Sequence, residues 1–389
     1  MDIGVSCRIV RAQGDFERAL SKGFEAAGFE LALAVEKWQP ARVVYEKNFD
    51  HPVKDLDLAD LIDAVAGVKK EKPEIIIGGP PCQDFSAAGE RIESHRARLT
   101  VSYAEIIRAV RPTWFLMENV MEARKSVSWL SARRLLSNAG YGITECVLNA
   151  AYYGVPQNRK RFFAVGRLEE DDDFLLDDLL DGAADAPMTV REFVKDEFDF
   201  DYYYRHPRTW ERRAIYSVDE PSATIRSTNR PVPPSYQRHP GDAAPPKEVR
   251  SLTPEQRARI QTFGKTFKFL GSAAQKDIMI ANAVPVKLAR HVAKAIKRFE
   301  DARAMTPGDR TFRSWLTDTQ HYTPRTAGNV ISRFKRANRI LQSTRMPIDP
   351  LDAIHALERR REYATLTSAV RSQIKKAVRL HAEFKGRDK

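Results

Sequence analysis

Apolar runs of strand length alternate with amphipathic helical stretches through the first ~165 residues of the chain, and no other feature constrains the fold as much. Strand, helix and strand at this spacing predict βαβ units around a parallel sheet. The expected strands are 31–35, 74–77, 114–117, 142–149 and 162–165. The expected helices are 19–27, 40–48, 103–110 and 127–139.

Three of the expected strands lead directly into polar or glycine-rich segments. These segments begin at Glu36, at residues 78–86, and at Glu118 and Asn119. Ligands of such sheets bind beyond the carboxyl ends of the strands. We therefore expect the three segments to converge on one site.

The segment at residues 78–86 reads GGPPCQDFS. Two glycines and two prolines predict a sharp, rigid turn that presents Cys82 at the end of a strand. A free thiol has a pKa of about 8.5, and neighbouring cations increase the reactive thiolate fraction. A cysteine after a single proline is more often a buried structural residue, but the longer string favours a nucleophile.

Two further strings follow in order, FLMENV at 115–120 and QNRKRFF at 157–163. Either one alone would more often be a solvated turn or a charged strand end. Together with GGPPCQDFS they resemble the motifs of the DNA (cytosine-5)-methyltransferases. The resemblance extends over residues 20–300 and includes RSLTPEQ at 250–256 and ANAVP at 281–285, where Ala281 replaces the family's glycine. It implies a Rossmann-like α/β fold that uses S-adenosylmethionine.

The resemblance also implies catalytic roles. Cys82 would attack carbon 6 of a cytosine flipped out of duplex DNA, because a base inside the stack cannot be reached. Glu118 would contact N3 and the exocyclic amine. Arg161 and Arg159 would hold the cytosine carbonyl and a nearby phosphate, and Asn119 would order the loop that carries Cys82.

Other positions match the DNA and donor sites of the family. Gln83 would fill the space that the flipped base leaves. The expected DNA contacts are Gln83, Ser86, Gln157 and Arg226. On the donor side, Glu36 would bind the ribose hydroxyls, Trp38 would stack on the adenine, and Asp55 or Asp57 would meet its amine. The remaining donor-pocket positions are Pro81, Leu99, Asn282 and Val284, and no metal is expected.

One family feature is missing. The family begins with an Asp-x-Phe-x-Gly-x-Gly-type loop around the donor, whereas residues 8–16 read RIVRAQGDF, which is neither a convincing strand nor a glycine loop. One hypothesis is a reading-frame error, because codons for this segment read one base over can spell DCSGAGGL; sequencing the gene tests it. The alternative is a DNA-binding relative that cannot hold the donor. A tRNA-directed cytosine methyltransferase is a third possibility.

Composition divides the rest of the chain. We expect a catalytic domain at 1–166 plus 251–300, a target-recognition domain at 167–250 and a basic helical domain at 301–389, with an acidic linker or insertion at 168–186. A formal net charge of +12 predicts a polyanionic partner. Three widely spaced cysteines and no apolar membrane span predict a cytoplasmic, nucleoid-associated prokaryotic protein. We expect a monomer that modifies double-stranded DNA beside a separate restriction endonuclease.

Overall fold

A seven-stranded sheet forms the centre of the computed structural model, which describes residues 8–11, 18–80, 98–209, 211–305, 312, 315–341 and 349–386. The strand order is β3-β2-β1-β4-β5-β8-β6. The strands are β1 Arg8–Arg11, β2 Glu30–Val35, β3 Val53–Lys54, β4 Ile75–Gly78, β5 Trp114–Asn119, β6 Tyr141–Asn149 and β8 Lys160–Leu168. The expected strands are confirmed, with ends shifted by up to three residues.

The expectation that residues 8–16 hold no convincing strand is wrong, because Arg8–Arg11 form β1. β1 lies in the middle of the sheet and pairs in parallel with both β2 and β4. Main-chain hydrogen bonds to two neighbours define a strand whatever its side chains, and a pattern of apolar residues does not reveal them.

β8 departs from the expected parallel arrangement, because it runs antiparallel to both β5 and β6. A parallel pair needs a crossover of a dozen or more residues. The connection from β6 to β8 holds only residues 150–159, which form the short helix η3 Ala150–Tyr152 and the two-residue strand β7 Gln157–Asn158. The chain therefore turns back beside β6.

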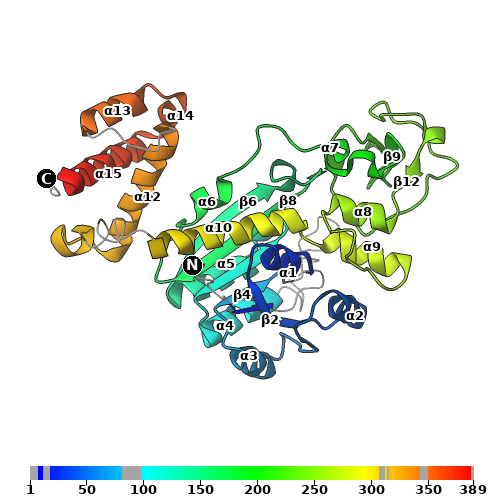
Figure 1. The fold of residues 1–389 in the computed structure, drawn as a ribbon, viewed down its shortest axis with the longest axis horizontal. Coiled ribbons are helices and arrows are strands. Elements are labelled where there is room, and N and C mark those ends of the chain that lie inside the picture. The colour runs from blue at the N-terminus through cyan, green and yellow to red at the C-terminus, as the bar shows by residue number, and fades with distance from the viewer. Residues whose placement is uncertain are drawn as a thin grey trace.

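Helices cover both faces of the sheet (Figure 1). On one face, α1 Arg18–Glu25 packs along α10 Val286–Met305, and their apolar side chains share a core with Ile75, Ile77 and Leu116. The other face is covered by α3 Leu61–Lys69, α4 Arg98–Val110 and α5 Val127–Asn138. α2 Gln39–Asn48 follows β2, and η2 Met121–Lys125 follows β5. The expected helices are thus confirmed, and residues 286–305 return to the sheet after the intervening region.

The acidic segment at 168–186 is not the solvated linker that its composition predicts. It contains the short helix α6 Leu176–Leu180, and Leu175 and Leu179 are fully buried in the core beneath α1 and α10. The leucines at this spacing place one face of the turn in the core, and the aspartates remain on the other. Asp177 and Asp178 lie beside cations of later helices.

Short strands and helices form a second body at the other end of the sheet from the C-terminus (Figure 1). Its elements are α7 Val190–Val194, η4 Lys195–Glu197, β9 Tyr202–Tyr204, β10 Ile215–Ser217, β11 Ser222–Ala223, η5 Pro246–Glu248, β12 Arg250–Ser251, α8 Pro254–Ile260 and α9 Ala273–Asn282. Tyr203, Val190 and Ile280 share one apolar cluster, so α8 and α9 pack with the strands of this region. The boundary at residues 250 and 251 stays a prediction.

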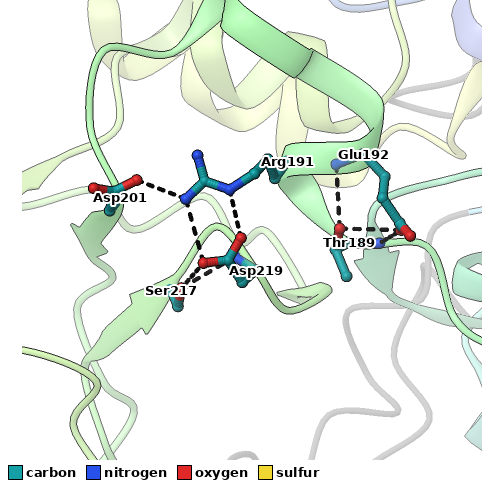
Figure 2. A network of polar contacts seen from close by, with 6 residues as sticks. All are labelled: Thr189, Arg191, Glu192, Asp201, Ser217 and Asp219. Carbon is teal, nitrogen blue, oxygen red and sulfur yellow. Dashed lines mark hydrogen bonds and ion pairs between the residues drawn. The ribbon is translucent and has the colours of Figure 1, made fainter.

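An ionic network connects the first turns of this body (Figure 2). Thr189 and Glu192 form a capping box at the start of α7. Arg191 on the same helix donates to Asp201 at 2.6 Å and to Asp219 at 2.5 Å. These residues come from the helix, the loop before β9 and the turn after β10. The network therefore links α7 to the outer ends of the paired strands β9 and β10.

The C-terminal helices have separate apolar clusters. They are η6 Trp315–Thr319, α12 Pro324–Leu341, α13 Pro350–Glu358, α14 Arg361–Ala364 and α15 Ser368–Gly386. Ile354, Tyr363 and Ile374 belong to one cluster, and Leu316 and Ala377 to another. α12 lies against the catalytic body through an ion pair of 2.5 Å between Arg339 and Asp177.

Gly78 provides a test of how the sheet edge is built. A Cβ at this position would lie 2.5 Å from the Tyr103 ring, whose hydroxyl donates to the carbonyls of Ile76 and Leu116. We predict that Gly78→Ala lowers the free energy of unfolding by about 1–3 kcal/mol in chemical denaturation, because the ring must move.

The matched control is Gly264→Ala, since a Cβ there meets only one side-chain atom at 3.9 Å. We expect a change within about 0.5 kcal/mol at this exposed position. Equal stabilities for the two variants would contradict the packing around Gly78.

Candidate active site

Two polar side chains lie at the carboxyl end of β5. Glu118 is 7% exposed and Asn119 is 4% exposed. Arg161, on the neighbouring antiparallel strand β8, places its Nε 3.0 Å from Oε1 of Glu118. The strand pairing that closes the sheet thus brings together two residues that the sequence separates by more than 40 positions.

Burial raises the pKa of Glu118, and the nearby guanidiniums of Arg161 and Arg159 oppose that shift. The carboxyl group therefore keeps its proton to a higher pH than a free glutamate does. A buried carboxyl of this kind can donate a hydrogen bond to a ring nitrogen as well as accept one. The site can thus supply both a proton and a counter-charge at one point.

Asn119 connects the ends of two adjacent strands. Its side-chain amide donates to the carbonyl oxygen of Pro80 at 3.0 Å, and its Oδ1 accepts from the backbone amide of Val120 at 2.8 Å. Pro80 follows β4 and precedes the predicted nucleophile Cys82 by two residues. Pro81, Cys82, Gln83 and Ser86 lie outside the described residues.

Glu36 occupies the end of β2, as predicted from its place after the apolar run. It is fully buried, and its Oε1 accepts the backbone amide of Trp38 at 3.1 Å. Trp38 is half-buried at the start of α2. An acid at the end of the second strand suits ribose hydroxyls in sheets of this class. The residues present therefore fit a nucleoside at this edge.

The two aspartates predicted for the adenine amine are both engaged with cations. Asp57 pairs with Lys37 at 2.5 Å, and Asp55 pairs with Arg42 at 2.7 Å. These pairs attach the loop after β3 to the start of α2.

The other described donor positions come from separate helices. Leu99 is half-buried in the first turn of α4, and Asn282 is half-buried at the end of α9. Val284 is 1% exposed and belongs to the core cluster of α1 and α10.

Gln157 is placed differently from the expected DNA contact. It is fully buried, its Nε2 donates to Gln261 at 3.0 Å, and its Oε1 accepts from the backbone amide of Ile225 at 3.0 Å. Both ends of its amide thus bind protein. Gln261, which the sequence analysis did not single out, donates onward to the carbonyl of Ile280 at 2.7 Å.

Arg159 takes part in the same connection. It is 1% exposed, and its guanidinium donates to the carbonyls of Ala281 at 2.6 Å and Ile225 at 3.3 Å. Ile225 belongs to the segment after β11, and Ala281 belongs to α9. Arg159 and Gln157 therefore hold residues of the expected recognition region against the end of the central sheet.

Arg226 follows directly and has a half-buried guanidinium. It donates to the carbonyl of His206 at 2.5 Å, while its Nε has no hydrogen-bond partner among the described residues. Burial and the cations Arg205 and Arg208 lower its pKa. Crowded guanidiniums of this kind favour an anionic ligand.

The helices in the described part of the chain include none that is both long and apolar enough to cross a bilayer. The histidines, cysteines and acids of the same part form no group of three or more that could hold a metal ion.

The pair of Glu118 and Arg161 generates a pH-dependent prediction. In Arg161→Gln the buried carboxyl loses its counter-charge, so we expect the free energy of unfolding to fall by about 3 kcal/mol at pH 8. The pKa of Glu118 in the folded protein lies above its unfolded value of about 4.3. The cost of burying the unpaired carboxylate therefore grows as the pH rises above about 4.3. The loss in free energy of unfolding of Arg161→Gln should be smaller at pH 5.5 than at pH 8.

Chemical denaturation of the wild type and of Arg161→Gln at pH 8 and pH 5.5 checks this prediction. Glu118→Gln/Arg161→Gln is the control. The double variant lacks the buried carboxylate and should be more stable at pH 8 than Arg161→Gln. A pH-independent loss in Arg161→Gln would contradict the assignment.

Comparison with known proteins identifies the family. A family model described as C-5 cytosine-specific DNA methylase matches residues 18–298, which begins directly after the segment that lacks the glycine loop. The Type II methyltransferase M.HgiDI of Herpetosiphon aurantiacus is 47% identical over 281 residues, which are 72% of this chain and 91% of that protein. The Type II methyltransferase M.HindV of Haemophilus influenzae is 47% identical over 287 residues, which cover 72% of this chain and 93% of that protein.

Solved structures agree on the fold. The methyltransferase Dnmt2 of S. pombe superposes with a TM-score of 0.61 at 16% identity, over 76% of this chain and 99% of that one. The Entamoeba histolytica methyltransferase EhMeth superposes with a TM-score of 0.58 at 15% identity, over 76% of this chain and 98% of that one. These confirm the predicted Rossmann-like methyltransferase fold. Because the family match spans most of its length, the chain belongs to the C-5 cytosine-specific DNA methylases and is a DNA (cytosine-5)-methyltransferase.

Proposed function

We propose that this chain methylates carbon 5 of a flipped-out cytosine at a specific duplex site through a covalent bond to Cys82. The observation that carries the proposal is the group at the ends of β4 and β5. There Arg161 pairs with Glu118 at 3.0 Å, and Asn119 binds Pro80, two residues before the nucleophile, at 3.0 Å.

The chemistry follows from these residues. The Cys82 thiolate adds its electron pair to carbon 6 of the ring, and the ring electrons shift toward N3 and carbon 5. Glu118 donates its proton to N3, which neutralises the charge that develops there. Carbon 5 would then take the methyl group, and the sulfonium donor would leave as a neutral thioether. The N3 proton returns to Glu118. Solvent water takes the proton from carbon 5, and the electron pair of that C–H bond re-forms the double bond between carbons 5 and 6 as the Cys82 thiolate leaves. Arg161 pairs with Glu118 and would also bind the cytosine carbonyl.

Asn119 would position Cys82 rather than react, because its amide binds the backbone of the loop. Arg159 and Gln157, which bind protein at the described ends of their side chains, would likewise position the recognition segment at residues 222–226. Gln83 and Ser86 stay predicted DNA contacts. Arg226 stays a predicted DNA contact.

S-adenosylmethionine would supply an electrophilic methyl group on a sulfonium. Glu36 is suited to bind the ribose hydroxyls, and Trp38 to stack on the adenine. Asp55, Asp57, Pro81, Leu99, Asn282 and Val284 complete the predicted donor pocket. β1 lies between β2 and β4, which supports a donor site at this edge of the sheet. Residues 12–17 lie outside the described residues.

The curated relatives at 47% identity are named Type II methyltransferases, which supports a modification enzyme of a restriction–modification system. The chain would act as a monomer on double-stranded chromosomal DNA in the cytoplasm, beside a separate endonuclease of the same specificity. The names of these relatives favour DNA over tRNA as the substrate. Target recognition would lie in residues 167–250.

Transfer of labelled methyl from S-adenosylmethionine to unmethylated genomic DNA tests the proposal. We expect wild-type protein to label the DNA and Glu118→Gln to lose at least about 100-fold in rate, since a positioned proton donor contributes about 10²–10⁴. Glu122→Gln, on the exposed helix η2 four residues away, is the matched control and should keep the wild-type rate.

Folded wild-type protein that binds DNA but transfers no methyl would contradict the proposal and favour a relative that cannot hold the donor. Equal loss in both glutamine variants would contradict the assignment of Glu118. Labelling of tRNA in preference to DNA would show that the substrate is tRNA and not duplex DNA.

A further inference from the structure

The positive charge of the chain is concentrated outside the part that matches the family. Residues 301–389 hold 19 of the 64 lysines and arginines and only 9 of the 52 acids. Ten of the twelve net positive charges therefore lie in this region, whereas the family match ends at residue 298. The methyltransferase part is close to neutral, and the C-terminal helices are the basic part of the molecule.

The cations of these helices fall into two sets. Two cations on α12 lie toward the catalytic body, where Arg339 pairs with Asp177 at 2.5 Å and Lys335 lies near Asp178. Arg333 on the same helix instead donates to Gln373 of α15. α12 comes close to the loop before α6 at Gly328, since a Cβ there would lie 1.3 Å from a carboxylate oxygen of Asp171. The acidic face of α6 and the preceding loop thus neutralises α12.

The cations of α15 have a different environment. Arg371, Lys375 and Arg379 follow one another at intervals of four residues, so they form one row along the helix, with about 6 Å between successive side chains. Lys376 borders the same face and lies over the Tyr322 ring. Ala377 is buried on the opposite side of the helix, and the buried Ile374 and Val378 lie between that side and the row.

Glu358 offsets part of the charge of this row, because Lys375 and, more weakly, Arg371 lower its pKa. Lys375 pairs with Glu358 at 2.6 Å. Arg371 and Arg379 form no ion pair with any residue that the structure describes, and Arg379 is exposed. Figure 1 shows α12 on the side toward α6 and α10, and α15 on the far side from them. α15 therefore lies away from the contact between α12 and the catalytic body.

A cavity of about 550 Å³ opens at the beginning of the row. Its lining includes Arg371, Lys375, Ser368, Ser372 and Tyr363, together with Glu358. The serine hydroxyls and the first turn of α15 supply hydrogen-bond donors beside the two cations. Such a combination suits the oxygens of a phosphodiester.

We propose that the α15 row, defined by Arg371, Lys375 and Arg379, binds the phosphate backbone of duplex DNA without regard to sequence and holds the enzyme on DNA while it searches for its site. Only the choice of duplex DNA as the polyanion rests on the proposed function. Each phosphate contact should contribute about 0.9 to the slope of log K against log salt.

The test uses the full-length protein and a labelled 30-base-pair dA·dT duplex, which contains no cytosine and cannot engage the active site. We expect Arg371→Gln/Arg379→Gln to weaken binding several-fold at 50 mM KCl and to reduce the salt slope by about 1–2. Arg371→Glu/Arg379→Glu should weaken binding further. Unchanged melting temperatures would show that the variants fold.

The control Lys69→Gln/Lys70→Gln removes the same charge from the exposed end of α3, which leads to the amino end of β4, away from the active site. This control should leave both the affinity for the duplex and the salt slope unchanged. An unchanged slope in the α15 variant, or an equal loss in the control, would overturn the proposal. A loss of binding to a 30-nucleotide RNA without a loss for the duplex would also overturn it.

Methyl transfer to cytosine-containing DNA at low salt separates the two proposals. If wild-type protein transfers no methyl, the proposed function fails, yet the dA·dT slopes still decide the role of α15. We expect transfer by the α15 variants to stay at the wild-type level on short duplexes at low salt.

Discussion

The hydrogen bond from Asn119 to Pro80 is the contact on which the arrangement of the active site depends. It joins the carboxyl ends of β5 and β4 at 3.0 Å, and so relates the residue beside Glu118 to the loop that leads to Cys82. Two strands of a parallel sheet place their ends at one edge, but they do not orient the loops that follow. A buried amide that binds loop backbone supplies this orientation, because leaving either group unpaired would cost free energy.

The ion pair between Glu118 and Arg161 has a different purpose. Buried pairs contribute little net stability, since desolvation offsets most of their attraction. Here burial raises the pKa of Glu118 while Arg161 opposes the shift. The balance leaves a carboxyl that can both hold a proton and become charged during a reaction. We infer that the pair is retained for chemistry, and that the antiparallel strand β8 is what makes it possible.

Most strands of the sheet and several site residues could be predicted from the sequence, because short local patterns of residues mark them. Apolar runs that end in Glu36 or Glu118 mark the carboxyl ends of strands, and the order of three short motifs indicates the family. β1 could not be predicted, because pairing with β2 and β4 defines it. The partners of Gln157 and Arg159 also could not be predicted. Ile225 and Ala281 lie more than 60 residues away, so only the fold brings them together.

Covalent trapping tests the central claim most directly. Duplex DNA with 5-fluorocytosine at the target position cannot lose a proton from carbon 5 after methyl transfer, so the bond to the enzyme should persist. With S-adenosylmethionine present, the account predicts a protein–DNA complex that survives denaturation for the wild type, with peptide mapping to Cys82, and none for Cys82→Ala. A complex of equal yield in Cys82→Ala, or an adduct at another residue, would contradict the account.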